Sequence, residues 1–172
     1  MRKIRVSSVL ASSFRDELER IVFFNPEQSL VTGPLLTSIQ RYGIPSVVED
    51  DHGLRFSVKA FGLLQTLYAF DDDEEGARLA GVAMFTRPRR TSIVIIHLAA
   101  HEDYTAKGKW SNASVVGHLV AAIRAASLRT RGVRTLRIPY PHEVRLDLHT
   151  HPPSRAPVSQ QAKGLRRLAK HP

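Results

Sequence analysis

The sequence predicts one domain of mixed α/β (α+β) architecture, with N-terminal helices, an antiparallel meander of strands and a β-α-β crossover. Three observations carry this prediction. Apolar residues first recur at helical spacing, over about residues 13–42. They then fall into short runs separated by turn residues, over about residues 46–98. Finally, a β-branched strand, a long amphipathic helix and a second strand follow one another, and this order makes the two strands a parallel pair.

A strand and two helices are expected in the N-terminal quarter of the chain. Residues 3–9 alternate weakly between apolar and polar side chains, as a first strand would. Ser13 stands before two acidic residues and an apolar run, which is typical of a helix start. A second helix is expected to end at Tyr42, because Gly43 and Pro45 follow it.

The middle of the chain predicts a single antiparallel meander. Short apolar runs predict strands at 47–48, 54–58, 63–70, 79–85 and 92–98. The acidic segment 71–76 is expected to be a solvated loop, and residues 87–90 are expected to form a turn.

The crossover and one more strand occupy the last part of the domain. Residues 113–131 place apolar side chains at three- and four-residue spacing, and Gly132 marks the end of this helix. Strands are expected at 133–138 and 144–148. The helix at 113–131 joins the strand at 92–98 to the strand at 133–138 and so completes the crossover.

The positive charge of the chain is concentrated in its C-terminal part. The 172 residues have a formal net charge of +9, and residues 1–100 hold 12 basic and 12 acidic side chains whereas residues 101–172 hold 13 and 4. This excess suits an anionic partner, either the phosphates of a nucleotide cofactor, a nucleic acid or an acidic protein, although it also serves solubility. We predict a single domain over residues 1–150 and a basic, Pro-rich tail over residues 151–172. Docking of this tail on a second copy of the chain would make a homo-oligomer.

Absences in the composition exclude several kinds of site. The chain has no cysteine, which excludes disulfides, thiolate metal sites and a cysteine nucleophile. No apolar run reaches the roughly 18 residues that a membrane span needs. We therefore expect a soluble, cytoplasmic protein with no membrane partner.

Residues 95–138 carry the most specific pattern of the chain. A strand ends at Leu98-Ala99-Ala100, a loop with Lys107-Gly108-Lys109 follows, and a long helix runs to Arg131-Gly132-Val133 before the next strand. A helix N-terminus has unpaired N–H groups and about half a positive charge, so a basic loop with a glycine that leads into it is suited to phosphate. This order of elements resembles motif A of the GNAT superfamily of N-acetyltransferases, and the resemblance covers about residues 3–140.

The resemblance implies a mixed sheet that binds acyl-coenzyme A. In that family a bulge, here expected at 98–100, separates the strand from its parallel neighbour, and the pantetheine arm lies between them. The family loop has three signature positions, of which only Gly108 is kept, because the other two are Thr105 and Trp110. The residues that the resemblance implies for coenzyme A binding are Leu98, Ala99, Ala100, Lys107, Gly108, Lys109, Trp110 and Ser111.

Two functions are left open by the resemblance. The first is an acyl-CoA-dependent N-acyltransferase, with acetyl-CoA as co-substrate, an amine as acceptor and no metal. The second is an inactive relative that uses the fold to bind a protein or a nucleic acid. The second stays open because Val94 occupies the position at which many family members carry a carboxylate base.

No residue is assigned as the catalytic acid or base. Alternation places His97 on the face opposite Val94, where we expect a packed or surface histidine. His101, just past the expected bulge, is the better candidate base. Tyr140 is the only tyrosine near the place of the family's usual general acid, and we expect it to pack or to close a turn.

A third function, zinc hydrolysis, is suggested by the C-terminal histidines. His149 and His151, followed by prolines, resemble the metal loop of the JAB/MPN zinc isopeptidases. The position of the aspartate ligand is Ala162, so a zinc ligand is missing. We therefore expect well under one zinc per chain.

Overall fold

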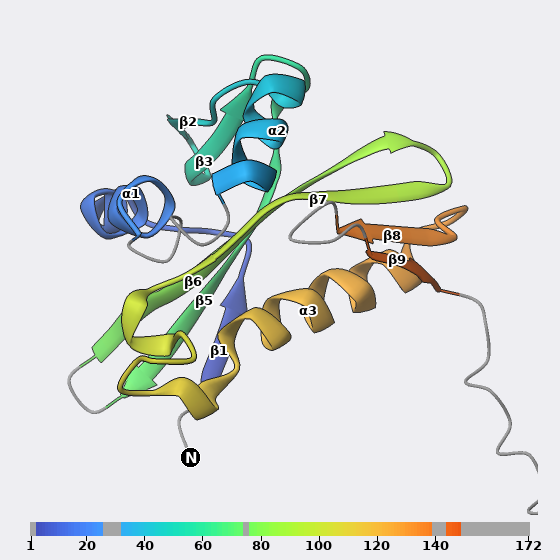
Figure 1. Ribbon diagram of the computed structural model, residues 1–172. Helices are drawn as coiled ribbons and strands as arrows, with labels where there is room; N and C mark the ends of the chain where they lie inside the picture. Colours follow the sequence, from blue (N-terminus) through green and yellow to red (C-terminus); the bar gives the residue numbers. More distant parts are fainter. Residues whose placement is uncertain (1–2, 26–31, 74–75, 139–143, 149–172) are drawn as a thin grey trace, which may run out of the picture.

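Two β-sheets and three α-helices make up the described part of the protein (Figure 1). The computed structural model describes residues 3–25, 32–73, 76–138 and 144–148. One sheet has six strands and is mixed, and the other has three antiparallel strands. The architecture is therefore mixed α+β, and the prediction of the fold class is confirmed at this level.

The six-stranded sheet has the order β1-β5-β6-β7-β8-β9. Neighbouring strands are antiparallel except for β7 and β8, which are parallel and are joined through helix α3, as the crossover pattern predicts. The strands are β1 (Ile4–Ser7), β5 (Gln65–Asp73), β6 (Gly76–Arg89), β7 (Ser92–Ala100), β8 (Thr135–Ile138) and β9 (Val144–Asp147).

A second sheet contains β2 (Ser46–Asp50), β3 (Gly53–Val58) and β4 (Gly62–Leu63). The predicted antiparallel meander is therefore confirmed for β5, β6 and β7, and the prediction is wrong in placing β2, β3 and β4 in the same sheet. The separate sheet is held to the domain through Leu10, whose carbonyl accepts a hydrogen bond of 2.9 Å from the N–H of Leu54. A Cβ at Gly53 would lie 2.2 Å from that carbonyl oxygen, and Gly53 has φ +97°, so this approach requires glycine.

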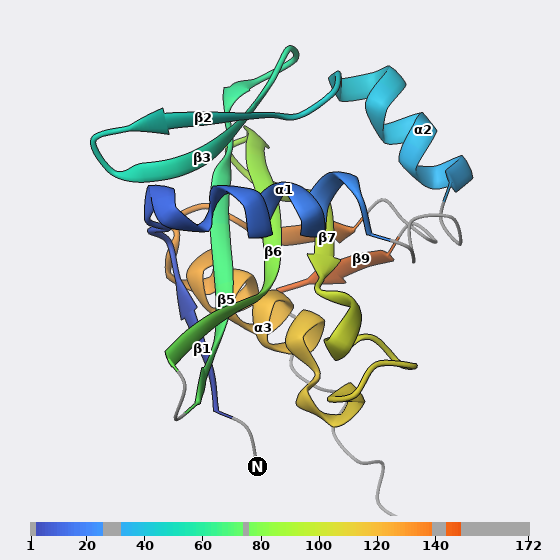
Figure 2. The same cartoon turned by 90° about the vertical axis from the view of Figure 1, so that its left-hand side faces the viewer.

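Two of the three helices, the first and the third, cover opposite faces of the large sheet. They are α1 (Arg15–Phe23), which follows the short 3-10 turn η1 (Ser12–Phe14), α2 (Thr32–Tyr42) and α3 (Val115–Arg129). Figure 2 shows α1 lying across β5, β6 and β7, with α3 behind them. The predicted end of the second helix at Tyr42 is confirmed, and the first helix begins two residues after Ser13.

The core consists of one apolar layer on each face of the large sheet. On the α1 side, Leu18 and Ile21 pack with residues of β3, β5 and β6. On the α3 side, Val115, Leu119 and Ile123 form one buried stripe at four-residue spacing, with each at most 1% exposed. Both layers include residues of β7, which is therefore buried on both faces.

Parts of two segments that were predicted as loop and turn belong to strands. The acidic segment was expected to be solvated, but β5 extends to Asp73 and Asp71 is only 1% exposed. Alternation along the strand turns Asp71 inward, toward the hydroxyl of Tyr104, and Asp72 outward, where it forms an ion pair of 2.9 Å with Arg5. Likewise β6 continues to Arg89, which leaves a shorter turn before β7 than predicted.

Several predictions concern residues outside the described part of the chain. These are Tyr140, His149, His151, Ala162 and the tail over residues 151–172. Over the ranges that are described, no helix is long and apolar enough to cross a membrane.

Candidate active site

β7 contains a bulge, which lies two residues before the predicted place. The strand pairs with β6 in regular register over residues 98–100, so the prediction of a bulge there is wrong. Met84 and Phe85 follow one another on β6 and lie opposite His97 and Ile95. Ile96 lies between these two pairs and is therefore the extra residue of the bulge. Neither glycine nor a break in the apolar run marks this position, so the sequence pattern gave no signal for it.

A pocket of about 190 Å³ lies against the bulge, between β7 and the helices α1 and α2. Its lining is mostly apolar, and its polar side chains are those of His97 and Ser38. The volume is below the roughly 300–1,000 Å³ of sites that enclose a whole ligand, so it suits one small group of a substrate. We call it the His97 pocket, and its lining residues are Val22, Phe23, Ser38, Ile39, Gly43, Ile44, Pro45, Ile96 and His97.

His97 is a buried histidine on the wall of this pocket, with 7% of its surface exposed. The prediction that it lies on the face opposite Val94 is wrong, because the bulge turns both Ile96 and His97 toward α1 and α2. Burial lowers the pKa of the His97 imidazole to about 4. The ring is therefore neutral at pH 7 and able to accept a hydrogen bond or a proton.

Among the described strands, β8 pairs with β7 only along the start of β7. β8 pairs with Ser92, Ile93 and Val94, and no described strand continues this pairing along residues 95–100. Two side chains bind carbonyls in this stretch: Asn25 Nδ2 donates to the carbonyl of Ala100 at 2.7 Å, and Ser38 Oγ donates to that of Ile96 at 3.4 Å. We call residues 95–100, the part of β7 beyond its pairing with β8, the β7 extension. A strand that continues past its neighbour can bind an extended ligand through main-chain hydrogen bonds.

The loop after β7 is held together by its own backbone. It contains the 3-10 turns η3 (Glu102–Tyr104) and η4 (Ser111–Ala113). The N–H groups at the three signature positions, Thr105, Gly108 and Trp110, donate to loop carbonyls at 3.2, 2.9 and 2.7 Å. A Cβ at Gly108 would lie 2.3 Å from the carbonyl oxygen of Glu102, so the loop's own packing already requires this glycine. The hydrogen bonds of these three N–H groups therefore hold the loop in one conformation.

Trp110 attaches the loop to the sheet. Its ring centroid lies 5.0 Å from that of the buried Tyr104, and the ring is approached by Lys109 Nζ at 4.9 Å and by the guanidinium carbon of Arg78 at 5.1 Å. These cation–π contacts hold both cations beside the loop, where Arg78 also lies 4.0 Å from the carboxylate of Asp103. Lys107, in the same loop, is exposed.

Helix α3 begins directly after this loop. Ser114, the residue before it, has φ 46° and ψ 47°, a left-handed conformation that is uncommon for a residue other than glycine. The first N–H groups of an α-helix have no acceptor within the helix, and the first turn of α3 contains no acidic residue. The start of α3 is therefore electrostatically suited to an anion.

His101, the predicted base candidate, has a structural role in the same loop. Its Nδ1 accepts a hydrogen bond of 3.2 Å from the N–H of Asp103 and so caps η3. This contact occupies one of the two ring nitrogens. His97, rather than His101, faces the pocket.

The predicted site residues fall at two adjacent places, along the end of β7 and in the loop that follows. Leu98 is half-buried and packs on the α3 side of the sheet, Ala99 is buried on the α1 side, and Ala100 is buried on the α3 side. Ser111 is exposed at the start of η4. Sequence reasoning missed Asn25 and Ser38, because their partners on β7 lie 75 and 58 residues further along the chain.

The described residues contain no group of three or more His, Asp or Glu side chains placed to hold a metal ion. Comparison with protein-family models, with curated proteins and with solved structures found no match to this chain.

Proposed function

We propose that this chain is an acyl-CoA-dependent N-acyltransferase with the sheet arrangement of the GNAT superfamily, and that acetyl-CoA is its co-substrate. One observation carries the proposal: β7 continues past its parallel neighbour β8 after Val94 and leads from a buried, neutral histidine to a preformed loop at the start of α3. A strand edge, a proton acceptor and an anion site therefore follow one another over about 20 residues.

Coenzyme A would lie along the β7 extension. Its pantetheine arm carries amide groups, which suit main-chain hydrogen bonds to a strand. Because the amides of Thr105, Gly108 and Trp110 bind within the loop, we assign the pyrophosphate to the first turn of α3 and to Lys107. Lys109 adds positive charge, and Gly108 and Trp110 contribute by shaping the loop.

The chemistry that acyl-CoA supplies is a thioester carbonyl carbon as electrophile and a thiol as leaving group. His97 accepts a hydrogen bond from the attacking amine and takes its proton as the C–N bond forms and the C–S bond breaks. The proton then passes to the sulfur, so the products are an amide and a free thiol. Negative charge that develops beside the imidazole favours its protonated form, which offsets the low pKa of the resting state.

The lining of the His97 pocket limits the acceptor. None of its lining residues is acidic, and most are apolar. A polyamine, which needs carboxylates to hold its extra charges, does not fit such a lining. We therefore propose an amine carried by a small apolar group as the acceptor.

A second candidate function is binding without catalysis. It is favoured by Val94, an apolar residue with 7% exposure at the position where the resemblance places a carboxylate base. Under this alternative the β7 extension would still bind a ligand, and no acyl group would be transferred.

Thiol release from acetyl-CoA tests the proposed acyltransferase against binding without catalysis. The chain has no cysteine, so a thiol-reactive dye reports released coenzyme A without background from the protein. A panel of primary amines is screened with the full chain, and acetyl-CoA binding is measured by calorimetry. His97→Gln should keep the affinity for acetyl-CoA and lower the rate by about 10²–10⁴-fold, which is the usual contribution of a general base.

His52→Gln, in the exposed turn between β2 and β3, is the matched control and should change neither quantity. Binding without turnover for any amine would support the binding module. The absence of binding at millimolar acetyl-CoA would contradict the proposed acyltransferase function.

A further inference from the structure

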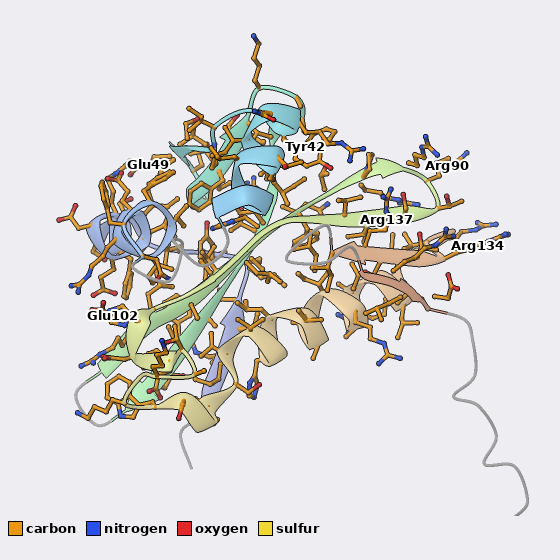
Figure 3. All side chains as sticks on the ribbon, in the orientation of Figure 1. Tyr42, Glu49, Arg90, Glu102, Arg134 and Arg137 are labelled. Carbon is orange, nitrogen blue, oxygen red and sulfur yellow. The ribbon has the colours of Figure 1, made fainter. Side chains whose placement is uncertain are left out.

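Among the described residues, those at one end of the molecule carry arginine almost to the exclusion of other charges. The segments 87–94, 129–138 and 144–148 contain eight arginines, one aspartate and no lysine. They meet where the turn between β6 and β7, the C-terminal end of α3, and the strands β8 and β9 come together. Figure 3 shows Arg90, Arg134 and Arg137 at this end, whereas Glu49 and Glu102 lie on the opposite side of the view.

Backbone contacts fix this arrangement. The guanidinium of Arg87 donates to the carbonyls of Arg90 and Arg131, the latter at 2.9 Å, and so links the β6–β7 turn to the end of α3. The N–H of Arg134 donates to the carbonyl of Thr91 at 2.8 Å and joins β8 to the same turn. Together with Gly132, Arg87, Arg90 and Arg131 line a hollow of about 450 Å³.

The strands β8 and β9 place two further arginines directly opposite each other. Arg137 pairs with Arg145 in the antiparallel register, so their side chains lie on the same face of the sheet. Like charges in this position destabilise a sheet. Asp147 lies 3.8 Å from Arg145, but both side chains are more than half exposed, so this ion pair is screened by water. The register therefore places two guanidinium groups within reach of one anionic partner.

We propose that these residues form a binding surface for the phosphate backbone of a nucleic acid. Arginine presents a planar fork of donors that binds phosphate oxygens in pairs, which the ammonium of lysine does not. This activity is separate from the proposed acyl transfer, because α3 leads from the candidate active site at its first turn to this surface at its last. We call it the arginine surface, and it comprises Arg89, Arg90, Arg131, Arg134, Arg137 and Arg145.

The composition of the three segments favours a nucleic acid over an acidic protein. Protein interfaces have an apolar or aromatic centre, whereas none of the exposed large apolar side chains of the described residues lies in these segments. The segments also contain no Phe, Tyr or Trp on which a base could stack. Contacts should therefore go to phosphates and should not depend on the base sequence.

Fluorescence anisotropy with the full chain and labelled 20-base-pair duplexes of RNA and of DNA tests this proposal. The variant R90Q/R134Q/R145Q removes three exposed charges, and K3Q/R41Q/K59Q removes three exposed charges elsewhere as the matched control. Loss of three phosphate contacts should reduce the slope of log affinity against log salt by about 2–3 and weaken binding at least tenfold at 100 mM salt. The control should stay within about threefold of the parent.

A second variant, R90K/R134K/R145K, keeps the charge and should keep the salt slope of the parent. RNA and DNA duplexes of different sequence should bind with similar affinity. The proposal is overturned by any of three results: the control weakens as much as the arginine-surface variant, the lysine variant loses the slope, or polyglutamate displaces the duplex at equal charge concentration. Affinity for acetyl-CoA should be the same in every variant, so this test and that of the acyltransferase can fail separately.

Discussion

The hydroxyl of Tyr104 donates a hydrogen bond of 2.7 Å to Oδ2 of Asp71, and both side chains are buried. This contact joins the loop after β7 to strand β5. Tyr104→Phe keeps the ring but leaves a buried carboxylate with one donor fewer, so we expect the free energy of unfolding to fall by about 1–3 kcal/mol. Urea denaturation measures this change. An unchanged midpoint would mean that the loop does not depend on the contact.

Gly108 and Gly117 predict opposite responses to alanine. A Cβ at Gly108 would lie within 2.4 Å of backbone atoms of Glu102 and Asp103, so Gly108→Ala must displace η3 and should cost about 1–3 kcal/mol of stability. A Cβ at Gly117 meets only the side chain of Ser114, which can rotate away. Gly117→Ala should therefore leave stability unchanged or raise it by about 0.5–1 kcal/mol, because alanine favours the helix.

Thermal unfolding of the two glycine variants, side by side, checks this contrast. Equal destabilisation by both would contradict the loop packing described here. Acetyl-CoA affinity should fall in Gly108→Ala, because the loop positions the start of α3.

Helix α3 is held to the sheet by a narrow buried stripe. Leu119 is fully buried, whereas Leu128 on the same helix is 47% exposed. Leu119→Ala should lower the free energy of unfolding by about 2–5 kcal/mol, through lost burial and the cavity left behind. Leu128→Ala is the matched control and should cost less than about 1 kcal/mol. Similar losses in both variants would mean that the helix packs through a different face.

Local sequence signals predicted the crossover well and predicted contacts between distant segments poorly. The parallel pairing of β7 and β8 follows from the strand, helix and strand order alone. The burial of Asp71 could not be foreseen, because it depends on Tyr104, 33 residues further along. The separate small sheet likewise depends on the bridge between Leu10 and Gly53, which no local pattern marks.

The candidate site shows the same division. The sequence identified the loop and the start of α3, because glycine, lysine and a helix start are local features. The face taken by His97 depends on the bulge at Ile96, and a run of consecutive isoleucines is compatible with regular alternation. The pocket therefore became visible only once the register between β6 and β7 was known.

His97 should make stability depend on pH. Its pKa is about 4 in the folded protein and about 6.5 in the unfolded chain, so between these values the unfolded state binds more protons. The stabilisation is complete above about pH 6.5 and is lost as the pH falls toward 4, by about 3 kcal/mol in total. Urea denaturation between pH 4 and 7.5 should show a shallower pH dependence for His97→Gln than for the parent. Identical slopes would show that the imidazole is not buried.

The central claim is that coenzyme A lies along β7 beyond Val94, with its phosphates at the first turn of α3. Hydrogen–deuterium exchange of the full chain, with and without saturating coenzyme A, tests this directly. We predict slower exchange in peptides that cover residues 95–100 and 112–118, and no change in the strands β2 and β3 at 46–58. The claim would be contradicted by the absence of protection at millimolar coenzyme A, or by protection confined to segments other than the β7 extension and the start of α3.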